Sequence, residues 1–170
     1  MTPRVLLHDD GQPDTAEGVA SQVINNFPGE QFQVCDCHRV LGNIRYSRGE
    51  TEKAIDHFRT ALKIASSFNW DIQLLWVHCD LAELFSNKDR FGDALVHIEH
   101  AKSHAVDNVY GLGRVMRLQA WFWYRQQKFK EARSAVSHAA DIFKRLGATE
   151  GIEGCRALLE MIEQAMKRQV

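Results

Sequence analysis

The stretch Leu41–Leu62, LGNIRYSRGETEKAIDHFRTAL, decides the fold. Apolar side chains recur every three or four residues on both sides of Gly49, which predicts two amphipathic helices joined by a tight turn. Gly42, Ala54 and Ala61 fall where the two antiparallel helices would touch. Small side chains at such a contact let the two backbones come close. The stretch therefore predicts a helical hairpin.

The small positions of this hairpin recur twice along the chain. Residues 42, 54 and 61 are followed after 40 residues, and again after a further 38, by alanines: Ala82, Ala94 and Ala101, then Ala120, Ala132 and Ala139. One helical hairpin cannot bury its apolar stripe alone, so the copies are expected to stack on one another.

The helical pattern also predicts the organisation of the chain. The helix predicted at about 14–26 looks like the second half of a repeat whose first half is missing, which hints at a fragment of a longer array. We predict an irregular lead-in over 1–13 and a single domain over 14–170, with repeats at about 31–68, 70–106 and 109–146 and a capping helix at about 149–168.

The order of small and aromatic positions resembles the tetratricopeptide repeat (TPR) family. The three copies read Gly42-Ala54-Phe58-Ala61, Ala82-Phe85-Phe91-Ala94-Ala101 and Ala120-Trp123-Phe129-Ala132-Ala139. The resemblance implies an all-α fold, a right-handed superhelical array of antiparallel helix pairs (a TPR-like solenoid) with about three repeats plus flanking helices. The steps of 40 and 38 exceed the family's usual period of about 34, which implies helices lengthened by about a turn.

Four further segments resemble the C-terminal TPR arrays of fungal receptor-like proteins that carry a NACHT or NB-ARC type NTPase. They are Thr51–Ile55, Ala65–Trp70, His100–Ala105 and Gln119–Tyr124. In that family the repeats are thought to sense a ligand and to control NTPase-driven assembly. The resemblance implies a sensor array or its stand-alone descendant, although the sequence contains no NTPase motif.

The TPR resemblance also implies a concave binding face, formed by the first helix of each pair. That face would be locally basic and aromatic with one carboxylate, and would suit a protein or peptide ligand, acidic ones included. The alternatives are that Trp121 and Tyr124 pack against a neighbouring repeat and that the arginines form an ordinary solvated face. The predicted site residues are Arg39, Asn43, Tyr46, Trp76, Glu83, Asn87, Arg114, Arg117, Trp121, Tyr124 and Arg125.

Some TPR proteins grip a C-terminal carboxylate with Lys and Asn side chains. Arg39, Asn43 and Arg117 match three of those places, whereas Glu83 would repel the carboxylate. We therefore favour a more general peptide or protein surface over a carboxylate clamp.

Composition and motifs exclude several other classes of function. The net charge of −1 supplies no field that would attract nucleic acid, and no apolar run reaches the ~20 residues that span a membrane. Four cysteines in predicted helices suit free thiols in a reducing compartment, so we expect a cytoplasmic protein. We also expect neither a cofactor nor a bound metal. Self-association through an uncovered repeat face is left open.

The alternative reading is a metal- or thiol-dependent enzyme. His97, His100 and His104 share one helical face and could hold Zn or Ni, and Cys79 or Cys37 could supply a thiol. No metalloprotease motif accompanies the histidines, so we expect a solvated face with titratable side chains.

Overall fold

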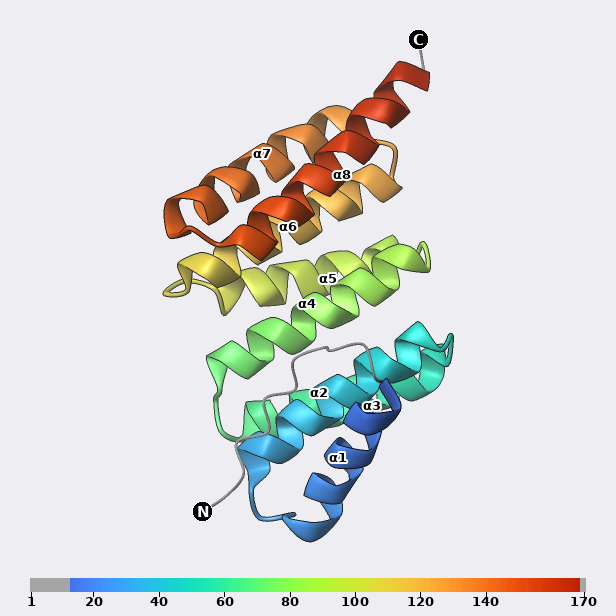
Figure 1. The fold of residues 1–170 in the computed structure, drawn as a ribbon, viewed down its shortest axis with the longest axis vertical. Helices are drawn as coiled ribbons and strands as arrows, with labels where there is room; N and C mark the ends of the chain where they lie inside the picture. Colours follow the sequence, from blue (N-terminus) through green and yellow to red (C-terminus); the bar gives the residue numbers. More distant parts are fainter. Residues whose placement is uncertain (1–12, 169–170) are drawn as a thin grey trace. The chain divides into compact units, whose positions relative to one another are not determined.

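The structure, a computed structural model, describes residues 13–168, and within that range every regular element is an α-helix (Figure 1). This confirms the all-α fold class for the described residues. Each predicted repeat contains one pair of helices. The elements are α1 (Pro13–Asn26), α2 (Gln31–Ser47), α3 (Thr51–Ser67), α4 (Asp71–Asn87), α5 (Phe91–Ser103), α6 (Val109–Arg125), α7 (Phe129–Leu146) and α8 (Thr149–Arg168).

The chain forms two compact units, Met1–Gln73 and Leu74–Val170, and each is described by itself. The predicted single domain and the superhelical array therefore stay predictions. The predicted lead-in, residues 1–13, lies outside the described residues except for Pro13, which begins α1.

Small residues bring α2 and α3 together in the first unit. A Cβ atom added to Gly42 would lie 2.6 Å from Cε1 of Phe58, whose ring is fully buried. Ala54 and Ala61 on α3 are also fully buried. The predicted close contact of the two helices at these small residues is confirmed.

Helix α1 packs against α2 through both apolar and charged side chains. Ala20 and Val23 are buried in one cluster with Cys37 and Leu41 of α2. Beside this cluster, Glu17 forms ion pairs with two arginines at the C-terminal end of α2, Arg45 and Arg48.

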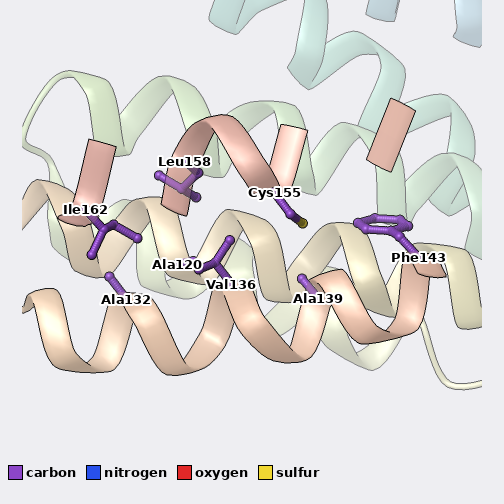
Figure 2. Packing of buried hydrophobic residues seen from close by; sticks show 8 residues of the cluster. All are labelled: Ala120, Ala132, Val136, Ala139, Phe143, Cys155, Leu158 and Ile162. Carbon is purple, nitrogen blue, oxygen red and sulfur yellow. The ribbon is translucent and has the colours of Figure 1, made fainter. Parts of the chain in front are cut away.

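The core of the second unit lies among α6, α7 and α8 (Figure 2). Gly151 makes room for the buried Phe143 ring, because a Cβ atom at residue 151 would lie 2.4 Å from its Cγ. The prediction that α8 covers the apolar stripe of the preceding helix pair is confirmed. Figure 2 shows the buried side chains that meet there: Ala120 from α6; Ala132, Val136, Ala139 and Phe143 from α7; Cys155, Leu158 and Ile162 from α8.

One turn geometry recurs between successive helices. At Gly49 the backbone takes φ 78°, its N–H donates to Tyr46 O at 2.9 Å, and the next N–H donates to Arg45 O at 2.9 Å. The left-handed residue at the later turns is Asn69, Asp89, Gln127 and Gly147. Gly147 ends α7 in this way, since it is the C-cap residue of that helix with φ 64°.

Candidate binding site

A hollow of about 280 Å³ lies in the second unit between α4, α6 and α8. Two residues one turn apart on α4 line it, together with two stripes of side chains that share the spacing i, i+3, i+4, i+7. Such a stripe is one face of a helix. The lining residues are Cys79 and Glu83 from α4; Arg114, Arg117, Leu118 and Trp121 from α6; and Gly154, Ala157, Leu158 and Met161 from α8.

Arg114 is already paired within the protein. Its Nη2 donates to Oδ1 of the buried Asp80 at 2.9 Å, and its guanidinium lies 5.2 Å from the ring centre of Trp76. A buried carboxylate needs such a partner. Asp80 therefore neutralises the positive charge of Arg114, which the sequence analysis had assigned to ligand binding.

A second network holds the far end of α6. Asn87 Oδ1 accepts from Trp121 Nε1 at 2.8 Å and from Arg125 Nη1 at 3.2 Å. Arg125 also forms an ion pair with Asp89 at 2.8 Å, while Tyr124 stacks on Trp121 with ring centres 5.4 Å apart. These side chains fix α6 against α4, and the surface is less basic than predicted because two aspartates neutralise two arginines.

Two charged side chains of the hollow have no such partner among residues 13–168. Arg117 Nε is buried without a hydrogen bond, and Glu83 forms neither a hydrogen bond nor an ion pair. Glu83 is exposed to solvent at the hollow, yet desolvation by the surrounding protein raises its pKa, an effect that the charges of Arg114 and Arg117 partly offset. Glu83 and Arg117 are therefore the predicted residues that remain available to a ligand.

The first unit carries the other three predicted residues. Asn43 is exposed on α2, and Arg39 and Tyr46 are half-buried on the same helix. They belong to Met1–Gln73, which is described by itself, so their part in a face shared with the second unit stays a prediction.

The sequence analysis missed the wall that α8 contributes. Its signal was present, since Gly154, Ala157, Leu158 and Met161 repeat the spacing of the α6 stripe. We had expected α8 only to cover the third repeat. Gly154 has no side chain, and a Cβ atom there would lie 3.2 Å from Nη1 of Arg117, so this glycine gives the guanidinium its place.

The histidine face at α5 is only partly the solvated surface that we predicted, since His100 is exposed whereas His97 and His104 are half-buried. His97 Nδ1 lies 2.8 Å from Nδ1 of His78, a buried residue of α4, and the His78 ring stacks on those of His100 and His104. Burial, reinforced by the neighbouring imidazoles, lowers the pKa of His78 to about 3 and that of His97 to about 4.

The same arrangement occurs once more in the first unit. His38 Nδ1 of α2 and His57 Nδ1 of α3 lie 3.1 Å apart, each 40 residues before its counterpart. Burial lowers the pKa of both imidazoles. Among residues 13–168, no group of three or more His, Cys, Asp or Glu side chains is arranged to hold a metal ion.

The four cysteines are buried, and none of them forms a disulfide bond within residues 13–168. Burial raises the pKa of Cys35 and of Cys37 to about 11, and that of Cys155 above its ordinary value. A thiol with a raised pKa is a weak nucleophile near neutral pH.

Comparison with known proteins shows the fold alone. No protein-family model matches the chain, and no curated protein matches it. The chain is similar to the crystal structure of BtubC (BKLC) from P. vanneervenii, with a TM-score of 0.65 and 15% sequence identity over 92% of this chain and 75% of that one. None of the described helices combines the length and apolar character that crossing a membrane requires.

Proposed function

We propose that the chain is a non-catalytic protein- or peptide-binding module whose ligand enters the hollow between α4, α6 and α8. The observation that carries this proposal is the pair of unpartnered charged groups, Glu83 and Arg117, beside an apolar lining. A buried N–H without a partner costs about 1–3 kcal/mol, and a ligand acceptor offsets that cost.

The shape and lining of the hollow support a side chain of a peptide as the occupant. Leu118, Ala157, Leu158 and Met161 offer apolar contact on both walls, and the charged groups lie next to them. Concave sites that mix an apolar lining with a few polar groups are typical of ligand recognition. A sensor role in a fungal NTPase receptor and a cytoplasmic location rest on the sequence resemblance, and we keep both as part of the proposal.

Panning a phage-displayed library of random peptides against the full chain tests the module. Selected peptides are then measured by calorimetry on the wild type and on Arg117→Met, which keeps a long side chain and removes the donors. We expect Arg117→Met to weaken binding about tenfold, the effect of one lost hydrogen bond to a charged group.

Arg133→Met is the matched control, since Arg133 is an exposed arginine of α7 outside the hollow. If both variants lose peptide affinity equally, or if neither loses any, the peptides bind outside the hollow.

The metal- or thiol-dependent enzyme is the alternative hypothesis. Its histidine version now includes His78, because His78 contacts His97. Elemental analysis of the purified protein after dialysis distinguishes the metalloenzyme from the binding module. A stoichiometric metal that is lost when His78 and His97 are substituted would favour the enzyme.

A further inference from the structure

We propose that the hollow recognises a primary carboxamide, the end of an Asn or Gln side chain presented by a peptide. This inference rests on the proposed function and names the chemistry of the ligand group. The amide oxygen accepts from the Arg117 guanidinium, and the amide N–H donates to the Glu83 carboxylate.

The charges of the lining disfavour a charged ligand group. An anion attracted by Arg117 is repelled by Glu83, and a cation attracted by Glu83 is repelled by Arg117. Arg114 does not change this balance because Asp80 neutralises it at 2.9 Å. A neutral group that offers both a donor and an acceptor is favoured by both unpartnered side chains.

The placement of the two groups on different helices favours an amide over a hydroxyl. Glu83 comes from α4 and Arg117 from α6, and the charge of Arg117 acts on Glu83 although no ion pair joins them. A carboxamide carries its acceptor and its donor on two separate atoms, whereas a hydroxyl must use a single oxygen for both. The methylene groups of Asn or Gln then contact Leu118 and Leu158.

The size of the hollow favours the end of a side chain over the peptide backbone. Its volume of about 280 Å³ is lined by three helices and open on one side, and the α8 wall has small residues at Gly154 and Ala157. The two polar atoms of a primary amide lie at its tip, so it enters end-on. A backbone amide continues as chain on both sides and presents its N–H and C=O in opposite directions.

Four probes of matched size test the inference by NMR: propionamide, propionate, propylammonium and 1-propanol. The signal to follow is the indole N–H of Trp121, which lines the hollow and donates to Asn87. We expect propionamide to shift this signal saturably, with a dissociation constant at least about tenfold below those of the other three. N-methylacetamide, a backbone mimic, should bind as weakly as the alcohol.

Two substitutions then separate the roles of the charged groups. Arg117→Met should weaken propionamide binding about tenfold, while Glu83→Gln should retain it within about threefold and improve the binding of propionate, because the repelling charge is gone. Arg133→Met should leave every probe unchanged. Thermal unfolding of each variant confirms that it is folded.

Several outcomes would overturn the inference. They are equal or tighter binding of propionate, propylammonium or 1-propanol; no saturable shift with propionamide; and unchanged binding in Arg117→Met. Tighter binding of N-methylacetamide would assign the hollow to peptide backbone instead. If the selected peptides bind the hollow without needing Asn or Gln, the carboxamide inference fails while the proposed function stands. If propionamide binds but no peptide is selected, the proposed function fails alone.

Discussion

Mild acid should destabilise the protein through its paired histidines. The perturbation is a change from about pH 7 to about pH 5. One proton satisfies the contact between His78 Nδ1 and His97 Nδ1, at 2.8 Å, since one nitrogen donates and the other accepts. Protonation of both imidazoles would remove the acceptor and place two positive charges in contact.

The sign follows from the folded pKa values, which lie below the ordinary 6.5 at about 3 for His78 and about 4 for His97. In the window between them and 6.5, the unfolded chain binds protons that the folded chain excludes, so the free energy of unfolding falls as pH falls through 6.5. About pH 5 is roughly 1.5 pH units below the unfolded pKa, so each histidine lowers the free energy of unfolding there by about 2 kcal/mol.

The sum for the pair is about 4 kcal/mol, and we expect a measured loss of about 2–4 kcal/mol because half-buried His97 regains water once it is charged. The ion-paired carboxylate of Glu17 does not contribute to this window. Arg48 lowers the pKa of Glu17, so the stability that Glu17 supplies is lost only at a more acidic pH.

The chain offers its own control for this prediction. In the third copy of the pattern, 38 residues further on, Met116 and Ala135 stand where His78 and His97 stand, and both pack against the core. The double variant His78→Met, His97→Ala introduces that apolar pair and leaves the equivalent pair in the first unit in place.

Urea unfolding followed by far-UV circular dichroism gives the free energy at each pH. The wild type should lose about 2–4 kcal/mol more than the double variant between about pH 7 and pH 5. An equal loss in both proteins would refute the reasoning, because the acid sensitivity would then come from other groups.

The remaining predictions concern packing, turns and thiols. Gly42→Ala places a methyl carbon 2.6 Å from the fully buried Phe58 ring, so the free energy of unfolding in urea should fall by about 1–3 kcal/mol; an unchanged value would mean that the helices separate without cost. Gln127→Gly removes a side chain from a residue held at φ 60° and should stabilise by up to about 1 kcal/mol in the same assay, whereas a loss would show that this turn is unstrained. Buried Cys35 and Cys37, both with a pKa of about 11, should react with a disulfide reagent near neutral pH only as fast as the helices open, and immediate reaction would contradict their burial.

The helices could be predicted closely because the sequence marks them twice, by apolar periodicity and by turn residues. Gly49 and Gly147 are left-handed as their lack of a side chain allows, and the small positions of α2 and α3 lie at the helix contact. The left-handed conformation of Gln127 could not be predicted from its residue type, because glutamine does not favour it. Only its place in the repeat, equivalent to Gly49 and Asp89, indicates that conformation.

The candidate site was harder to predict because its charges are settled by partners on other helices. The arginines of α6 could be placed on one face, but whether each is free depends on how α6 is rotated against α4. That rotation pairs Arg114 with Asp80 and Arg125 with Asp89, and leaves Arg117 without a partner. His78 was missed for the same reason, since only the packing of α4 on α5 brings it to His97.

Helix α8 has two faces that serve different neighbours, and this couples ligand occupancy to its local stability. One face buries Cys155 and Ile162 against the core, and another supplies Gly154, Ala157 and Met161 to the hollow. A fluctuation that lifts α8 away therefore removes one wall of the site, so a bound ligand opposes it. At about 100 times its dissociation constant a ligand adds about 2.7 kcal/mol to that opening, which would slow amide hydrogen exchange along α8 about a hundredfold.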